Sequence, residues 1–233
     1  MKLRRLPLFR VLTIYVFACS AMLPAFDTPR AIAVHFPISY PAISFLNART
    51  GWILAARGTA VTVMRTSDAG RSWVRLARLS LAFNEPSMQF VDDRHGWIST
   101  VGPTFCGGLK RPPCHTVLLR TGDGGKHWSR LVAPATNGYA ITFVDSLHGW
   151  LLHSQIPCKS ICSRSLYATV DGGMTWRLLP AAPRLSLMTM SWANREHGWL
   201  GGGDARSCIS SIFATINGGR TWTRQLALPK HCR

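Results

Sequence analysis

Acidic residues are the scarcest chemical class in this 233-residue sequence, which has ten Asp plus Glu against 27 Lys plus Arg. Outside two repeated motifs, the remaining carboxylates are Asp27, Glu85 and Asp204. A hydrolase that needs a pair of carboxylates is hard to assemble from so few. The sequence also has no glycine-rich phosphate loop, zinc-ligand spacing or nucleophile elbow. We therefore expect no cofactor, no metal and no catalytic residue, and a protein that is not an enzyme.

Helical periodicity is also missing, because no window of residues 26–233 keeps an apolar period of 3.6 residues. The apolar run at 11–23 is too short to span a membrane as a helix, and basic residues precede it. This pattern predicts a signal peptide or N-terminal anchor over residues 1–25. A loose lipoprotein box ending at Cys19 leaves lipidation open. Each alternative places the rest of the chain outside the cytoplasm, as a secreted, periplasmic or membrane-tethered protein.

The chain contains a box, T-x-[DN]-x-G-x-[STH]-W, in four copies about 50 residues apart. The copies occupy residues 66–73, 121–128, 169–176 and 215–222. A second motif, ending in Gly-Trp, alternates with the box and closes at Trp52, Trp97, Trp150 and Trp199. Trp192 takes the place that Phe has in the other copies of this motif, so the repeat accounts for every tryptophan.

Each box follows a short apolar run that is typical of a strand, and its D-x-G or N-x-G predicts a hairpin turn. The Asp or Asn side chain can accept hydrogen bonds from the backbone of the turn, and the Trp supplies apolar area for packing. Catalysis or calcium binding is the alternative role for the Asp residues. A turn role is favoured because it recurs in every unit and Asn217 serves in one of them. These structural residues are Asp68, Gly70, Trp73, Asp123, Gly125, Trp128, Asp171, Gly173, Trp176, Asn217, Gly219 and Trp222.

The repeat predicts an all-β fold, a small β-propeller of four visible four-stranded units over residues 41–233, preceded by a tether at 26–40. In each unit a first strand ends at the Phe of F-x-[DN] and a second starts at Gly-Trp. The box hairpin supplies the third and fourth strands. A closed four-bladed ring, an open arc and a ring completed by another copy all fit this pattern.

Six cysteines follow the leader, and an even number in an exported chain favours disulfide bonds. Their positions in the repeat predict two disulfide bonds across variable loops and one that links the C-terminal tail to the fourth unit. Zinc binding is the alternative, because His115 and His231 lie beside cysteines. The predicted pairs are Cys106 with Cys114, Cys158 with Cys162, and Cys208 with Cys232.

The formal net charge is +17, so the chain attracts an acidic protein surface, an anionic membrane or another polyanion. Solubility is the alternative reason for the charge, and no nucleic-acid motif is present. His95, His148 and His197 share one repeat position, which favours a turn or packing role over a common metal site. Basic residues on or beside the boxes predict a partner-binding rim, made of Arg65, Arg71, Arg120, Lys126, Arg164 and Arg220.

The box resembles the Asp-box, or sialidase-type, repeat of several β-propeller families. Its alternation with [DN]-x-x-H-G-W resembles the repeat of the photosystem II assembly and stability factors, over about residues 41–222. That resemblance implies an exported, non-catalytic propeller that binds a membrane-protein subunit, although family members generally have more than four units. The alternatives are a sialidase-like glycoside hydrolase and a module that binds glycans or anionic surfaces.

Overall fold

The computed structural model describes residues 42–57, 60–80, 84–101, 116–134, 138–154, 164–183, 187–204 and 209–229. The chain divides into a unit of Met1–Ala33 and a unit of Val34–Arg233, and every described residue belongs to the second. The predicted leader, the tether and all the cysteines lie outside the described residues. Export and the three disulfide bonds therefore stay predictions.

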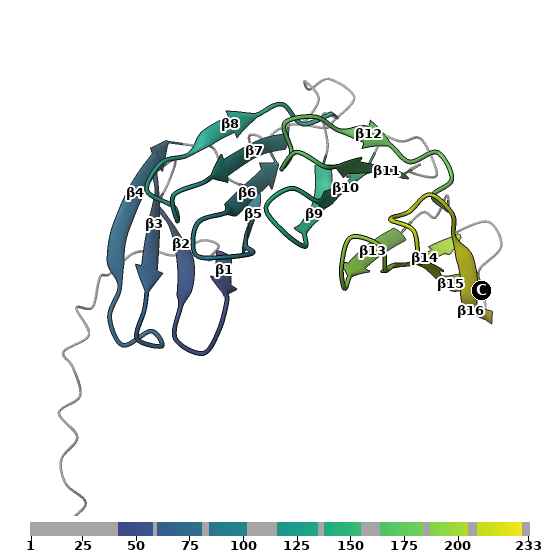
Figure 1. Cartoon of the computed structure of the whole chain (residues 1–233), viewed down its shortest axis with the longest axis horizontal. Helices are drawn as coiled ribbons and strands as arrows, with labels where there is room; N and C mark the ends of the chain where they lie inside the picture. Colours follow the sequence, from purple (N-terminus) through teal and green to yellow (C-terminus); the bar gives the residue numbers. More distant parts are fainter. Residues whose placement is uncertain are drawn as a thin grey trace, which may run out of the picture. The chain divides into compact units, whose positions relative to one another are not determined.

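The described residues form sixteen strands in four antiparallel sheets, each with its four strands in chain order (Figure 1). The first sheet contains β1 (Ala42–Phe45), β2 (Gly51–Arg57), β3 (Ala60–Thr66) and β4 (Val74–Ser80). The second contains β5 (Asn84–Phe90), β6 (Gly96–Val101), β7 (Thr116–Thr121) and β8 (Ser129–Leu131). The third contains β9 (Gly138–Phe143), β10 (Gly149–Ser154), β11 (Arg164–Thr169) and β12 (Arg177–Leu178). The fourth contains β13 (Leu187–Trp192), β14 (Gly198–Asp204), β15 (Ile209–Thr215) and β16 (Thr223–Pro229).

This architecture confirms the predicted all-β fold of four four-stranded units. In the third sheet β9 ends at Phe143, β10 starts at Gly149 and β11 ends at the box residue Thr169, as the motifs predict. Within the described ranges no helix is present, and hence none that is long and apolar enough to cross a membrane.

The glycine of each Gly-Trp motif is required by the aromatic residue that faces it on the preceding strand. A Cβ atom added at Gly51 or Gly96 would lie 2.6 Å from the ring of Phe45 or Phe90, closer than real Cβ contacts. The same clash would arise at Gly149 with Phe143. Glycine therefore lets the ring lie flat against the start of the second strand.

The sheets pack in sequence order through three junctions, which join the first sheet to the second, the second to the third and the third to the fourth. At each junction the indole of a Gly-Trp motif stacks on the aromatic residue that ends the first strand of the next sheet. The stacked pairs are Trp52 on Phe90, Trp97 on Phe143 and Trp150 on Trp192, with ring centroids 3.8, 3.6 and 3.5 Å apart.

The same indoles are fastened to the next sheet by hydrogen bonds to its box. Trp52 Nε1 donates to Gly124 O at 2.8 Å, and Trp97 Nε1 donates to Gly172 O at 2.9 Å. The bond from Trp150 Nε1 to Gly218 O is longer, at 3.4 Å. Trp52 and Trp97 are almost wholly buried. Each junction is therefore both an apolar core and a directional contact.

Candidate functional site

The box carboxylates are engaged within their own turns. Asp171 accepts hydrogen bonds from Thr169 Oγ1 at 2.7 Å, from Thr175 N at 2.9 Å and from Thr175 Oγ1 at 2.5 Å. Thr169 Oγ1 in turn accepts from Gly173 N at 2.9 Å. Partial burial raises the pKa of Asp171, but the hydrogen bonds from Thr175 and Thr169 outweigh it and lower that pKa to about 2. The carboxylate is therefore ionised and occupied in holding the turn.

The fourth box keeps this geometry without a charge. Asn217 Oδ1 accepts from Thr221 N at 3.0 Å, and Asn217 Nδ2 donates to Thr221 Oγ1 at 2.8 Å. Thr215 Oγ1 donates to Asn217 Oδ1 at 3.0 Å, as the other box threonines do to their carboxylates. The turn thus needs oxygen acceptors at this position but not an anion.

The repeated histidines also bond within their own turns. His95 Nδ1 lies 2.8 Å from Asp92 Oδ2, and His148 Nδ1 lies 2.9 Å from Asp145 Oδ2. His197 Nδ1 lies 3.1 Å from Asn194 Oδ1. Among the described residues, no three His, Cys, Asp or Glu side chains gather where they could hold a metal ion.

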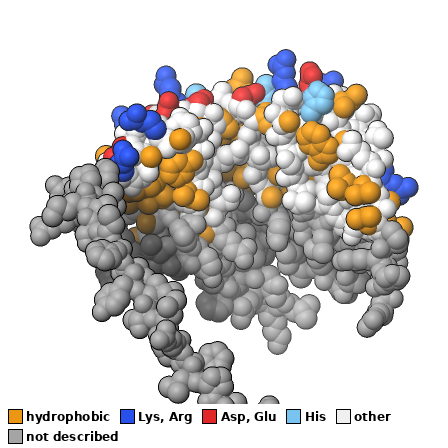
Figure 2. Space-filling view, turned by 90° about the horizontal axis from the view of Figure 1, so that it is seen from below, with side chains coloured by type: hydrophobic (Ala, Val, Ile, Leu, Met, Phe, Trp, Pro, Cys, Tyr) orange, Lys and Arg blue, Asp and Glu red, His pale blue; other side chains and the backbone are white. Residues whose placement is uncertain are grey.

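The residues of the predicted basic rim lie in different environments. Arg71 and Lys126 are exposed on their box turns, and Arg220 lines a pocket. Arg164 begins β11, at the strand end opposite to the box. Arg65 and Arg120 reach across junctions instead. Figure 2 shows basic, acidic and histidine side chains along one edge of the described surface, with hydrophobic side chains below them.

Arg65 and Arg120 occupy the same position, one residue before the box threonine, and each places its guanidinium over the indole of its own sheet. The Cζ atoms lie 5.2 Å from the ring centroid of Trp52 and 6.0 Å from that of Trp97. Such contacts between a cation and an aromatic face are favourable. The guanidinium group therefore fills the space beside the indole at the first and second junctions.

Each of these guanidinium groups also bonds to the next sheet. Arg65 Nη2 donates to Asp93 Oδ1 at 2.9 Å, which makes an ion pair between the first and second sheets. Arg120 donates to the backbone oxygens of Ser146 and Asp171, at 3.3 and 3.5 Å, on the third sheet. The arginine is thus a polar bridge above the apolar stack at these two junctions.

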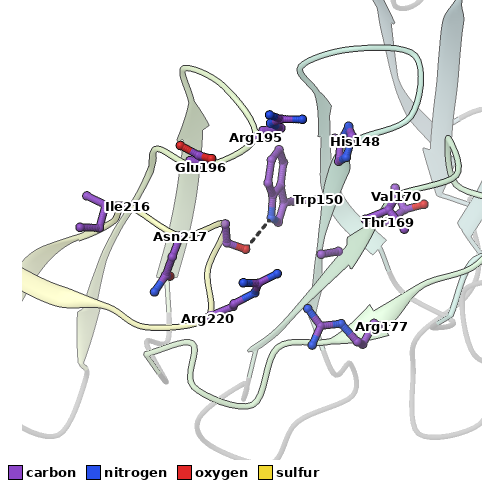
Figure 3. Close-up of a pocket in the computed structure, with 12 residues that line it drawn as sticks. His148, Trp150, Thr169, Val170, Arg177, Arg195, Glu196, Ile216, Asn217 and Arg220 are labelled. Carbon is purple, nitrogen blue, oxygen red and sulfur yellow. Dashed lines mark hydrogen bonds between the residues drawn. The ribbon is translucent and has the colours of Figure 1, made fainter.

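The third junction has Ala168 at this position, and a pocket of about 430 Å³ opens beside Trp150 (Figure 3). Alanine has neither the length nor the charge to fill the space that Arg120 fills at the second junction. Residues of the third and fourth sheets line the pocket. They are His148, Trp150, Ala168, Thr169, Val170, Arg177, Arg195, Glu196, Ile216, Asn217, Gly218 and Arg220.

Three arginines and one glutamate set the electrostatics of this pocket. In Figure 3 Arg195 lies next to the Trp150 indole, and Arg177 and Arg220 lie below it. Within the part of the chain that the structure describes, none of these three guanidinium groups has a hydrogen-bond or ion-pair partner, and the Glu196 carboxylate has none either. The arrangement can hold a carboxylate or another planar anion against an aromatic floor.

Sequence reasoning found Arg220 but missed Trp150, Arg177 and Arg195 as parts of a site. The signal was present in the residue before each box threonine, which changes from Arg65 and Arg120 to alanine in the third and fourth units. The alignment of the repeats would have shown where a filled junction gives way to an open one.

No protein-family model and no curated protein matches the sequence. Among solved structures, "YCF48 bound to D1 peptide" matches with TM-score 0.41 and 16% identity, over 82% of this chain and 84% of that one. A protein of unknown function from Dyadobacter fermentans matches with TM-score 0.53 and 15% identity, over 78% of this chain. The GH93 α-L-arabinofuranosidase of Fusarium graminearum matches with TM-score 0.51 and 12% identity, over 81% of this chain. The chain spans slightly less than two thirds, 66%, of the length of each of the latter two.

The match to the GH93 enzyme overturns the prediction that the protein is not an enzyme. That prediction relied on the scarcity of carboxylates, the missing catalytic motifs and the resemblance to non-catalytic propellers, but a glycoside hydrolase shares the fold at low identity. Catalysis depends on side chains placed on a scaffold, and the scaffold itself does not decide whether a chain is an enzyme. The comparisons show that the fold of this chain, four four-stranded antiparallel sheets, is that of a β-propeller.

Proposed function

We propose that this protein is an exported β-propeller that binds an acidic segment of a protein partner in the pocket beside Trp150. The observation that carries the proposal is that three guanidinium groups, none of which has a partner among the described residues, converge on a junction that Ala168 leaves unfilled. The class of partner we propose is a membrane-protein subunit or assembly intermediate.

The chemistry of the pocket favours a carboxylate-bearing ligand. Arginine binds carboxylates through paired hydrogen bonds, and charge-assisted bonds of this kind are stronger than neutral ones. The Trp150 indole is buried except for the part that faces the pocket, and Val170 and Ile216 are exposed at its rim. A peptide that places an Asp or Glu next to an apolar or aromatic residue would satisfy both the charged and the apolar parts of this surface.

The charge of the chain supports an acidic partner at longer range. A formal net charge of +17 creates a field that attracts anions and raises association rates at low salt. Removing one guanidinium from the pocket should therefore affect binding more than removing an equally exposed guanidinium elsewhere. This difference separates a site from a diffuse field.

The likeness of the repeat to the photosystem II assembly and stability factors supports a membrane-protein partner. The predicted leader over residues 1–25 supports export, in the same compartment as the extracytoplasmic parts of such a subunit. Both supports come from the sequence and are independent of the pocket.

The binding test uses fluorescence anisotropy with two labelled peptides of equal negative charge, one containing Phe beside Asp and one containing only Asp and Gly. We expect the Phe-containing peptide to bind more tightly. Arg220→Glu and Arg177→Glu should each weaken it at least about tenfold, because each removes charge-assisted bonds. Arg75→Glu is the matched control, because Arg75 is exposed on β4 of the first sheet. Equal weakening by all three variants would overturn the pocket as the site.

The partner class is tested by capture from detergent-solubilised membranes. The wild-type chain and the Arg75→Glu control should retain the same membrane protein, and Arg220→Glu should lose it. Assays on a sialoside and an arabinan substrate provide a further arm, because glycoside hydrolases share this fold. Turnover that Glu196→Gln abolishes would replace partner binding with a hydrolytic role for the pocket.

A further inference from the structure

Two exposed faces of the molecule resemble the two sides of a junction between sheets, but within the described residues neither face contacts a neighbouring sheet. The leading face, on β1, consists of Ile43 and Phe45, which are 63% and 44% exposed. The trailing face, on the fourth sheet, consists of Trp199 on β14, Ile212 on β15, and Leu226 and Leu228 on β16.

Two side chains of the trailing face are the repeat equivalents of side chains that are buried at the three internal junctions. Trp199 ends the fourth Gly-Trp motif, yet it is 37% exposed, whereas Trp52, Trp97 and Trp150 are at most 3% exposed. Ile212 lies three residues before its box threonine and is 39% exposed. The residues at that position in the other sheets are fully buried, and they are Val63, Leu118 and Leu166.

Strand register places the members of the trailing face on one side of the sheet. Trp199 pairs with Ala214, and Gly201 pairs with Ile212, so Trp199 and Ile212 share a side. Ile212 also pairs with Leu226 across β16. The result is a continuous apolar surface that begins at the indole and extends to the last strand.

The leading face already has the aromatic ring and the turn that accept an indole at the internal junctions. Phe45 lies edge-on to Trp73 with centroids 6.2 Å apart, as Phe90 does to Trp128 at 6.1 Å. Ala69 takes a φ of 65°, close to the 78° of Gly124, whose carbonyl oxygen accepts the Trp52 indole. Within the described residues, no indole stacks on Phe45 and none donates to Ala69 O.

We propose that the trailing face of one chain docks on the leading face of a second copy, and that two copies close an eight-bladed ring through two such junctions. Trp199 would then stack on the partner's Phe45 and donate to the partner's Ala69 O, which repeats the contacts of the three internal junctions. Eight blades fall within the range that propellers adopt. The contact joins two different faces, and such head-to-tail contacts form rings when the rotation closes.

The two faces are expected to bind each other because the three internal junctions already join such faces by the same stacking and hydrogen bonding. An exposed apolar patch of this composition is typical of an interface. If one chain closed on itself, Trp199 and Phe45 would be buried, as Trp97 and Phe143 are at the second junction. Trp199 and Phe45 are instead substantially exposed. The proposal is independent of the pocket beside Trp150 and of any function assigned to that pocket.

The test is the mass of the purified chain in solution, by light scattering after size exclusion and by sedimentation velocity. We expect twice the mass of one chain for the wild type. Trp199→Ala and Ile212→Glu on the trailing face, and Ile43→Glu on the leading face, should each reduce it to the mass of one chain. Ile43 and Ile212 are exposed, so their substitution leaves the fold of the single chain intact, which circular dichroism checks. Val132→Glu, at an 83% exposed residue on neither face, is the control and should keep the doubled mass.

A mixture of two variants tests the head-to-tail geometry. The Ile212→Glu chain keeps its leading face, and the Ile43→Glu chain keeps its trailing face, so the two together retain one intact junction. We expect the mixture to form a species of doubled mass that neither variant forms alone. A wild type of single mass at all concentrations, a doubled mass that survives the three face variants, or a mixture without the doubled species would each overturn the proposal.

Discussion

The second and third junctions are built from the same repeat and differ at one position. At the second, Arg120 lies over the Trp97 indole and donates to the backbone of the third sheet. At the third, Ala168 leaves the Trp150 indole beside a pocket of about 430 Å³. One side chain therefore decides whether a junction between sheets is a filled contact or a cavity.

The two junctions differ in strength as well as in shape. The indole hydrogen bond is 2.9 Å long at the second junction and 3.4 Å at the third. Among the described residues each junction also has one buried donor without a partner, Arg120 Nε at the second and Trp192 Nε1 at the third, so this destabilising term is common to both. The longer hydrogen bond and the missing guanidinium make the third junction the weaker one and leave an open, basic surface there. Binding sites often exchange stability for such a surface.

The largest expected effect is on stability, from removing the indole of the filled junction. Trp97→Ala should lower the free energy of unfolding by about 3–5 kcal/mol, because Trp97 is 1% exposed and its stack and hydrogen bond are both lost. Trp150→Ala should lower it by less than Trp97→Ala does, since an open pocket already adjoins that ring. Urea unfolding followed by circular dichroism measures both. A greater loss for Trp150→Ala would contradict the ranking of the two junctions.

Arg120→Ala should turn the second junction into one like the third. We expect a loss of about 1–2 kcal/mol in the free energy of unfolding, from the cation–π contact and the bonds to the third sheet. The same urea titration checks this value. Arg130→Ala is the control, because Arg130 is exposed on β8, and it should change the free energy by less than about 0.5 kcal/mol. A stabilised Arg120→Ala protein would show that the arginine is not a bridge.

Asp171→Asn should make the box at the second junction chemically like the box at the third, which has Asn217. We expect a change of less than about 1 kcal/mol at pH 7, because Asn217 shows that an amide can hold this turn. Asp171→Ala removes the acceptors and should destabilise the protein more than Asn does. Thermal unfolding of the two variants side by side checks the order, and an equal loss for Asn and Ala would show that the charge itself is needed.

The smallest expected effect concerns acid. The pKa of Asp171 is lowered to about 2 in the folded chain, below its ordinary value of 3.8. Its contribution is therefore fully present above about pH 4 and is lost as the pH falls towards 2. Urea unfolding at pH 6 and pH 2.5 should show a smaller acid loss for Asp171→Asn than for the wild type. Identical losses would mean that Asp171 does not contribute to the acid sensitivity.

Much of the fold follows from local chemistry that the sequence shows. Phe143 and Gly149 lie at strand ends because the Phe143 ring packs against the position that has no side chain at Gly149. Thr169 ends its strand because its hydroxyl accepts a hydrogen bond within the turn. These contacts form within one sheet, so short sequence motifs predict them. The relative burial of the two tryptophan sets was not predicted. The Gly-Trp indoles at the three junctions are buried, whereas Trp199 is 37% exposed, and the box residues Trp128 and Trp176 are only partly buried.

The pocket could not be predicted because it depends on contacts between sheets. Arg65 and Arg120 were expected on an exposed rim, but the neighbouring sheet offers acceptors that draw them across a junction. Arg195 and Arg177 come from different sheets, and only the packing of those sheets brings them to one pocket. A sequence shows which charged residues lie near a motif, whereas a pocket between two sheets can be recognised only when the packing of both sheets is known.

The most direct test of the pocket as a binding site is the affinity of the Ala168→Arg variant for the acidic, Phe-containing peptide. The new guanidinium should lie over Trp150, as Arg120 lies over Trp97, and fill the pocket while adding a positive charge. We predict that binding weakens at least about tenfold, with Ala168→Ser unchanged as the control. Binding that stays equal or becomes tighter in Ala168→Arg would show that diffuse charge attracts the peptide, and would contradict a site at the third junction.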